Sequence, residues 1–328
     1  MEVWYVDPGS IAGSPDGTTG HPYLSLQAAL VAKCNKTFTE AIQIRCRTTG
    51  DKPADTTRVT DDALTQFVAS AEYPLTICAD TGHRASTFWD PTKYRLFPAY
   101  STQAGTAILI SEAYVRLDGL QIGISSQTAA AEIVYWSGAS GVMSGCLVRG
   151  TNDTTYLTRG VSIIVGLTII KSLFYALGTI SAIVKNHGNS TFYNCTFIGG
   201  GGNLGVDIND GTCVAKNCYA GGSTNDYWVE AGHSLARTTC ASSDATSGSV
   251  GLCSKPVNAA NFKSVTTDDE DYAIPDVGSA LYHAGTDTST EDPPLDFTTD
   301  INGSTYYATT RSVGCDEFAS RLVLVLRG

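Results

Sequence analysis

Short stretches in which apolar and polar residues alternate recur along the middle of the chain at a nearly constant interval. If the position is allowed to shift by one residue between repeats, the pattern marks a column of small or sulfur-containing residues at Gly119, Cys146, Ser172, Cys195, Cys218 and Cys240. The steps along this column are 27, 26, 23, 23 and 22 residues. A repeat of this length, built from short strands, indicates a solenoid in which each unit buries its apolar face against its neighbours. The pattern therefore predicts an all-β, single-stranded parallel β-helix with regular coils over residues 107–241.

Residues 1–106 are interpreted as a cap followed by the first, irregular coils of the same continuous domain. Alternating segments predict strands at residues 3–7, 41–46 and 75–79. Between the first two, an amphipathic pattern predicts a short helix with Leu26, Ala29 and Leu30 on one face. We expect this helix to cap the open end of the β-helix, where strand edges and apolar core would otherwise meet water.

Residues 242–328 lack the regular repeat and are rich in Thr, Ser, Asp and Gly. They are expected to form the C-terminal coils and the closure of the β-helix. The last eight residues, 321–328, read as an apolar strand that either closes the last coil or engages a partner.

Composition and charge narrow the choice of partners. Only 16% of the residues are charged and 33 are Gly, which is typical of a turn-rich β-protein. The net charge of −11 would repel nucleic acid and anionic membranes, so neither partner is expected. No apolar run reaches membrane-spanning length, and the first residues show no secretory signal. An acidic polysaccharide would need a locally positive surface on this negatively charged chain.

The ten cysteines admit two interpretations. Four of them occupy the repeated column, where small apolar side chains would stack inside the coil, and there we favour free thiols over disulfides. Cys34 and Cys46 are the most suitable pair if any disulfide exists. No Cys or His spacing indicates a zinc site.

Ionisable residues on three successive repeats form the first candidate site. Counting along the 23-residue interval places His187 level with Asp210, and Asn186 level with Asn209, with His233 one coil further on. The surrounding candidates are Lys185, Asp207, Tyr227, Trp228 and Arg237. These residues would supply an acid, a base or a charge-neutralising group if the protein were an enzyme. The sequences Asn-His-Gly-Asn, from Asn186, and Asn-Asp-Gly, from Asn209, are equally typical of turns.

Two further groups of residues have both a functional and a structural interpretation. The aromatic and basic stretch with Trp89, Tyr94, Arg95, Phe97 and Tyr100 predicts either a ligand-binding platform for sugars or proteins, or a loop folded down over the coil. The acidic run Asp268, Asp269, Glu270 and Asp271 would bind Ca²⁺ or form a solvated loop, and we favour the loop. No other cofactor is expected.

Both ends of the chain resemble a known group of proteins. The text Tyr5-Val-Asp-Pro, with Asp16-Gly-Thr-Thr-Gly and Pro22-Tyr-Leu-Ser-Leu-Gln-Ala-Ala-Leu, resembles the opening of bacterial and phage right-handed parallel β-helix proteins of the pectate-lyase-like superfamily. The text from Asp271 to Asp287, with Asp300-Ile-Asn-Gly and Arg311-Ser-Val-Gly-Cys-Asp-Glu-Phe, is similar to the closing segment of the choice-of-anchor Q type domain. His283 and Cys315 are among the departures from that pattern. The superfamily includes lyases, hydrolases, adhesins and viral fibres, so the resemblance implies a fold without an activity.

Two hypotheses of different class follow. The favoured one is a non-catalytic structural or surface-displayed protein, such as a phage capsid decoration, fibre or tail component, located in the virion or outside the cell. The resemblance implies a homotrimer that contacts other virion proteins or a polysaccharide. The alternative is a polysaccharide lyase or glycoside hydrolase acting through His187, Asp210 and His233.

Overall fold

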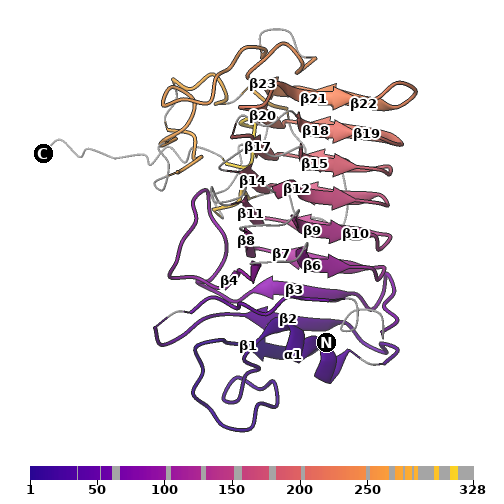
Figure 1. Ribbon diagram of the computed structural model, residues 1–328, viewed down its shortest axis with the longest axis vertical. Helices are drawn as coiled ribbons and strands as arrows, with labels where there is room; N and C mark the ends of the chain where they lie inside the picture. The colour runs from indigo at the N-terminus through magenta and orange to yellow at the C-terminus, as the bar shows by residue number, and fades with distance from the viewer. Residues whose placement is uncertain are drawn as a thin grey trace, which may run out of the picture.

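The structure is a computed structural model of the whole chain (Figure 1). It describes residues 1–34, 36–51, 53–60, 67–100, 105–126, 131–150, 157–176, 182–200, 204–248, 252–265, 270–275, 278–282, 284–286, 299–302 and 311–316.

The described residues form three sheets in which every strand pair is parallel. The nine-stranded sheet contains, in spatial order, β1 (Glu2–Val6), β2 (Ile42–Cys46), β3 (Leu75–Ala79), β7 (Val115–Asp118), β10 (Gly141–Ser144), β13 (Leu167–Ile170), β16 (Thr191–Tyr193), β19 (Thr212–Lys216) and β22 (Ser234–Thr238). The eight-stranded sheet contains β4 (Arg95–Leu96), β5 (Ala99–Tyr100), β8 (Gln121–Ser126), β11 (Leu147–Gly150), β14 (Leu173–Ala176), β17 (Thr196–Ile198), β20 (Tyr219–Gly221) and β23 (Ala241–Ser242). The six-stranded sheet contains β6 (Gly105–Ile110), β9 (Ala131–Trp136), β12 (Leu157–Ile163), β15 (Ala182–Asn186), β18 (Leu204–Ile208) and β21 (Asn225–Val229).

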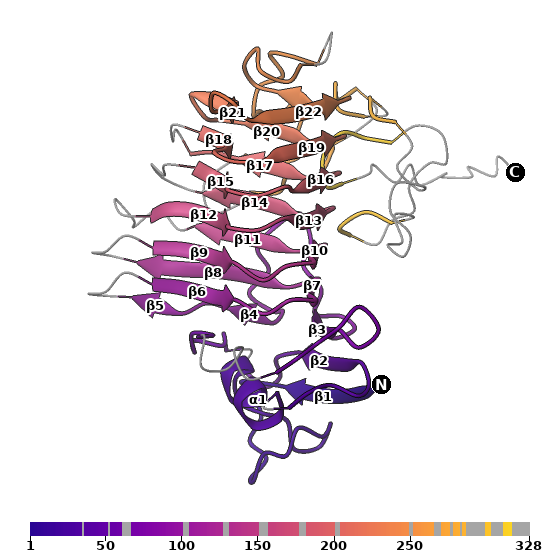
Figure 2. The same ribbon diagram turned by 90° about the vertical axis from the view of Figure 1, so that its right-hand side faces the viewer.

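The three sheets run side by side along one axis because each turn of the chain contributes a strand to each sheet in rotation (Figures 1 and 2). From β7 onward the order is regular, and β7, β8 and β9 are followed by β10, β11 and β12 one level higher. This arrangement confirms the predicted all-β parallel solenoid.

The repeated column lies where the chain passes from the nine-stranded to the eight-stranded sheet. Strand register aligns Leu120 with Cys146, so the predicted member Gly119 was one residue early. Gly119 instead belongs to the position before the column, where the backbone adopts a positive φ of 72°. We call this position the turn column, and its members, all with positive φ, are Gly119, Gly145, Lys171, Asn194, Asn217 and Thr239. Glycine fits both patterns, since it is small and tolerates the left-handed region.

The interior of the coil is closely packed and apolar. One continuous cluster of buried residues runs from Trp4 in β1 to Cys240 beside β23. Phe174 and Phe197, on adjacent coils, stack with ring centroids 5.3 Å apart. Stacking of like side chains on successive levels supplies the hydrophobic burial that a single coil could not obtain alone.

None of the ten cysteines forms a disulfide in the structure, as predicted for those of the repeated column. Cys34 and Cys46 do not pair either. Nine are buried, and only Cys253 is partly exposed. Burial raises the pKa of Cys146 to about 12 and that of Cys218 well above its ordinary value, because the thiolate would lose its hydration. These thiols therefore act as small apolar side chains.

A short helix, α1 (Leu26–Lys33), lies beside β1 at the N-terminal end of the solenoid (Figures 1 and 2). The Ser25 hydroxyl accepts a hydrogen bond from the Ala28 amide at 3.2 Å, a standard N-cap. The expected inner face, Leu26, Ala29 and Leu30, is buried in the main core. No helix in the described ranges has the length and apolarity needed to cross a bilayer.

Among the described residues, no strand follows β23. The C-terminal segment (the described residues from 252 to 316) packs on the outer face of the eight-stranded sheet (Figure 1). Phe262 and Tyr272 of this segment meet the outward rings of Tyr219 and Tyr175, with ring centroids 5.1 and 5.2 Å apart. The outer face of this sheet is apolar and needs this cover. The expected tail strand at 321–328 lies outside the described residues.

Two buried carboxyl groups help to fix the C-terminal segment. Asp316 accepts hydrogen bonds from the Ile274 amide at 2.8 Å and from the Asn302 side chain at 2.6 Å. It also shares a hydrogen bond with Asp300, and both residues are buried. Desolvation, with the charge of Asp300, raises the pKa of Asp316 well above its ordinary value. The pair is therefore stable as a proton-sharing unit.

The cysteine environment predicts selective thiol labelling. We expect one thiol, that of Cys253, to react rapidly with Ellman's reagent in the native protein, and all ten to react after unfolding. The absorbance of released thionitrobenzoate measures both numbers, and Cys253→Ser should abolish the rapid phase. Rapid labelling of several cysteines of the repeated column in the native state would contradict their burial in the structure.

The Asp300–Asp316 pair predicts a stability that falls as pH rises. A carboxyl whose folded pKa is raised stabilises the fold fully below its unfolded pKa of about 3.9, and this contribution is lost as pH rises through the folded value. Asp300→Asn removes the like charge and leaves an amide donor facing Asp316. We therefore expect melting temperature to fall less steeply with pH in Asp300→Asn than in the unsubstituted protein. Parallel slopes between pH 4 and 9 would show that the pair does not share a proton.

Candidate functional site

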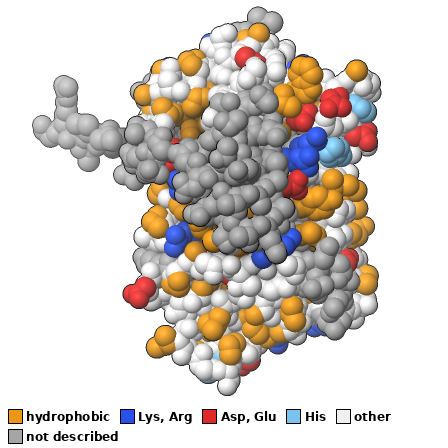
Figure 3. Space-filling view, viewed as in Figure 1, with side chains coloured by type: hydrophobic (Ala, Val, Ile, Leu, Met, Phe, Trp, Pro, Cys, Tyr) orange, Lys and Arg blue, Asp and Glu red, His pale blue; other side chains and the backbone are white. Residues whose placement is uncertain are grey.

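The candidate site lies on the outer face of the six-stranded sheet, where β15, β18 and β21 are neighbours. Strand register places Lys185, Asp207 and Trp228 directly above one another. Because side chains alternate along a strand, the preceding residues Val184 and Val206 point into the core, and these three point outward. We call Lys185, Asp207 and Trp228, with the turn residues His187, Asp210, Glu230 and His233, the Lys185 face. Figure 3 shows basic, acidic and histidine side chains gathered at the upper right of the molecule.

The predicted register of the turn residues was wrong by one position. The ladder pairs Asn186 with Ile208, whereas the 23-residue interval had placed Asn186 level with Asn209. The interval is 22 residues between β15 and β18 but 23 between β16 and β19, where Thr191 pairs with Val214. The extra residue is taken up in the turn that contains Asp210, so His187 is not paired with Asp210 in a ladder.

Asp210 and His233 are nevertheless brought together by consecutive turns. His233 Nδ1 lies 3.6 Å from Asp210 Oδ1, a distance that allows an ion pair when the imidazole is protonated. The Asp210 carboxylate is 64% exposed. Beside it, the Asn209 amide donates a hydrogen bond to the Glu230 carboxylate. These contacts are those of a solvated turn surface, and their contribution to stability is small.

Asp207 has an unusual environment for an outward-facing carboxylate. Only 3% of the residue is exposed, and its Oδ1 has no hydrogen-bond partner within the described part of the chain. Desolvation raises its pKa, and Glu230 adds to the effect, although Lys185 and Arg159 oppose it. Asp207 is therefore held ready to accept a hydrogen bond or a proton.

His187 has the opposite shift. Partial burial lowers the pKa of its imidazole, and the cations of Lys185 and Arg159 lower it further. The ring is consequently neutral near pH 7 and can both donate and accept a hydrogen bond. Its two neighbouring carboxylates, Asp210 and Glu230, favour the protonated form and only partly offset the shift.

The two aspartates do not have the same access to a ligand. Glycoside hydrolysis requires two carboxyl groups that flank one bond. Asp210 is largely exposed, whereas Asp207 is covered at the level of the sheet. The face thus offers charged and neutral hydrogen-bonding groups around an exposed indole, since Trp228 is 43% exposed.

Tyr227 and Arg237, which the sequence analysis grouped with this site, have structural roles. Tyr227 points into the core and is 3% exposed, because it precedes the outward Trp228. The Arg237 guanidinium lies 6.0 Å from the Tyr227 ring centroid and donates a 2.5 Å hydrogen bond to the Thr246 carbonyl. Both residues stabilise the last coils.

The sequence did not predict the buried hydrogen bonds of Asn186 or the ion pair between Glu132 and Arg159. The buried Asn186 side chain accepts a hydrogen bond from Ser190 at 2.5 Å and donates to the Asp210 carbonyl at 3.3 Å, which ties two turns together. Arg159 binds Glu132 at 2.6 Å on the lower part of the same sheet. Inward asparagine followed by His-Gly could have indicated the first feature, whereas the bulge before Arg159 hides the register of the second.

The aromatic stretch packs mainly against the coil. The Tyr94 ring is fully buried, and its hydroxyl donates a 2.9 Å hydrogen bond to Asp55, so it cannot bind a sugar. Trp89 lies against Phe97, with ring centroids 5.5 Å apart, and under the Arg149 guanidinium. Arg95 is half-buried in β4, and desolvation lowers its pKa. The Tyr100 side chain lies outside the described residues. The loop interpretation applies to Tyr94, and ligand binding by Trp89 and Arg95 stays a prediction.

The acidic run is described only in part, since Asp268 and Asp269 lie outside the described residues. The Asp271 carboxylate accepts hydrogen bonds from the Thr87 hydroxyl at 2.6 Å and from Lys263 at 2.8 Å. Glu270 is buried. Asp271 therefore joins the C-terminal segment to the stretch around Thr87. Within the ranges that the structure describes, no three His, Cys, Asp or Glu residues are grouped as metal ligands.

Comparison with known proteins adds little to this picture. No protein family and no curated protein was found to match the sequence. The solved structure of pectate lyase Pel9A is similar over 97% of this chain and 96% of its own, with 12% sequence identity and a TM-score of 0.40. A similarity of this size carries no argument about activity.

Proposed function

We propose that this chain is a surface-displayed structural protein, a component of a phage virion, that binds a polysaccharide along the outer face of its six-stranded sheet. The observation that carries the proposal is the outward column of Lys185, Asp207 and Trp228, in register on three successive coils. The column continues downward through Ser162 to Tyr135.

The chemistry of this column suits a chain of sugars. An exposed indole can pack against the apolar face of a pyranose ring, which is the usual way that aromatic side chains bind carbohydrate. Lys185 and the neutral His187 supply donors and acceptors for sugar hydroxyl groups. Successive coils are about 4.8 Å apart, so Tyr135 and Trp228 mark a surface about 19 Å long. A polymer laid along the axis would meet Tyr135 at one end of this surface and Trp228 at the other, with Lys185 between them.

The N-terminal end supports the structural part of the proposal. The inner face of α1 is buried, whereas Val31 on its outer face and Leu24 just before the helix are exposed apolar residues. A helix that is apolar on both sides is normally covered. We infer that α1 caps the first coil and that this end meets another protein of the assembly, with the chains associated as a homotrimer.

A polysaccharide lyase or glycoside hydrolase is the second candidate. It is favoured by one observation, the pKa shifts of Asp207 and His187 in opposite directions beside Lys185. Such shifts arise where an acid and a base are prepared for proton transfer. The same shifts also follow from burial of polar groups on a binding surface.

The binding proposal predicts that Trp228→Ala weakens polysaccharide binding at least about tenfold, which corresponds to about 1.4 kcal/mol of binding free energy. The loss follows from removal of the exposed ring. Affinity electrophoresis against a panel of neutral and acidic bacterial polysaccharides measures it. Phe88→Ala is the matched control, since Phe88 is 41% exposed but lies outside the Lys185 face. Equal affinity in Trp228→Ala and the unsubstituted protein would contradict the proposal.

The same incubations distinguish the two candidates. Unsaturated products would appear as ultraviolet absorbance, and hydrolysis would appear as new reducing ends. If either signal appears and is lost in both His187→Ala and Asp207→Asn, without a lower melting temperature, the second candidate replaces the first. Binding without either product supports the first.

A further inference from the structure

Carboxylates gather around the exposed indole of the Lys185 face. Asp207 lies directly below Trp228 in the strand ladder, on the same outer side. Glu230 follows Trp228 by two positions and is exposed, and the Asn209 side chain donates a hydrogen bond to it. Neighbouring levels of a parallel sheet are about 4.8 Å apart, and alternate residues of a strand about 6.6 Å apart. Trp228, Asp207 and Glu230 therefore surround one small area, which we call the acidic corner.

The charge around the acidic corner is negative. Glu230 receives its hydrogen bond from a neutral amide. Asp210, in the adjoining turn, faces His233, which carries a charge only when it is protonated. Lys185, one level below Asp207, is the cation of this column. While the imidazole is neutral, three carboxylates therefore face one ammonium group.

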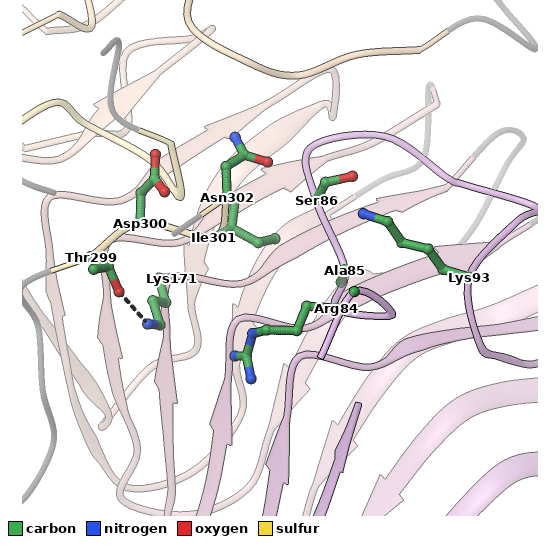
Figure 4. Close-up of a pocket in the computed structure, with 10 residues that line it drawn as sticks. Arg84, Ala85, Ser86, Lys93, Lys171, Thr299, Asp300, Ile301 and Asn302 are labelled. Carbon is green, nitrogen blue, oxygen red and sulfur yellow. Dashed lines mark hydrogen bonds between the residues drawn. The ribbon is translucent and has the colours of Figure 1, made fainter. Parts of the chain in front are cut away.

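The cleft between the stretch after β3 and the C-terminal segment is different in this respect (Figure 4). It has a volume of about 290 Å³ and contains several cations. Arg84 binds Asp118 through two hydrogen bonds of 2.7 and 2.6 Å, and Lys93 Nζ lies 3.9 Å from Asp90. Those cations are matched within the protein, whereas the acidic corner keeps an excess of carboxylates.

The buried carboxylate of Asp207 is a second, independent observation. Only 3% of the residue is exposed, and its Oδ1 has no hydrogen-bond partner within the described part of the chain. Lys185 and Arg159 favour the ionised form through their charge, but Arg159 itself binds Glu132 at 2.6 Å. A buried carboxylate oxygen without a donor costs free energy. A positively charged group bound beside the indole would reduce that cost.

We propose that the acidic corner binds an ammonium group, and that the polysaccharide of the proposed function carries such groups on its sugars. The second part rests on the proposed function, whereas the first does not. An indole attracts a cation through the negative face of its ring, and tryptophan does so best among the aromatic side chains. Carboxylates add charge-assisted hydrogen bonds to a primary ammonium group and Coulomb attraction to a quaternary one. The same carboxylates would repel a polymer of uronates or phosphates.

Choline and its neutral analogue 3,3-dimethylbutan-1-ol are the matched probes, because they have the same shape and differ in charge. The indole N–H resonance of Trp228, assigned by its loss in Trp228→Ala, reports binding of each probe to the full chain near pH 7.5 at constant ionic strength. We expect choline to bind saturably and the alcohol to bind roughly tenfold more weakly or less. Equal affinities, or no saturable shift with choline up to about 50 mM, would overturn the proposal.

Glu230→Gln is the decisive variant because the amide keeps the size of the side chain and can still accept the hydrogen bond from Asn209. It should fold normally and weaken choline binding roughly threefold or more. Asp51→Asn removes one exposed negative charge between β2 and β3, outside the Lys185 face, and should leave the affinity unchanged. Unchanged choline affinity in Glu230→Gln would rule out the acidic corner as the binding site.

Oligosaccharides separate this inference from the proposed function. Calorimetric titration compares N-trimethylated and N-acetylated glucosamine oligosaccharides of equal length, and we expect the trimethylated one to bind roughly tenfold more tightly. Equal affinities would retain polysaccharide binding and overturn the ammonium site. If choline binds at Trp228 and neither oligosaccharide does, the ammonium site stands and the polysaccharide proposal fails.

Discussion

The structure depends on the parallel pairing of each coil with the coils above and below it. A single coil has too few residues to enclose a core, so its inward side chains can be buried only against residues on neighbouring levels. In the regular coils each interior position must therefore match a residue 21 to 27 positions away, as Leu117 matches Met143 and Val206 matches Tyr227. Cysteine suits such a position because it is small and apolar, and the ladder cysteines gain nothing from ionisation while they are buried.

The same constraint creates the outer surfaces. When Val184 and Val206 are fixed inward, Lys185 and Asp207 must point outward and lie at adjacent levels. The outward column of the six-stranded sheet is polar around Lys185 and Asp207, whereas the outer face of the eight-stranded sheet is apolar and is covered by the C-terminal segment. The outer faces of the two sheets therefore differ in chemistry.

The sequence was sufficient for the fold because the repeat is a local, periodic signal. It was less informative about side-chain positions, since a period that changes between 21 and 23 residues shifts a neighbour by one position. Asn186, for example, was expected level with Asn209 and pairs with Ile208. Gly119 was misplaced because glycine satisfies both the column and the turn beside it. The cover over the eight-stranded sheet could not be predicted, since its contacts join residues such as Thr87 and Asp271 without any periodicity.

Distances between spin labels along one outward column would test the stacked register most directly. Gln43, Thr76, Arg116 and Ala236 lie in one such column on the nine-stranded sheet. In a Cys253→Ser background, one label replaces Ala236 and the second replaces each of the others in turn. Double electron–electron resonance should then give Cα separations of about 34, 29 and 24 Å, which decrease by about 4.8 Å per coil. Distances that do not shorten in equal steps would contradict the parallel coil.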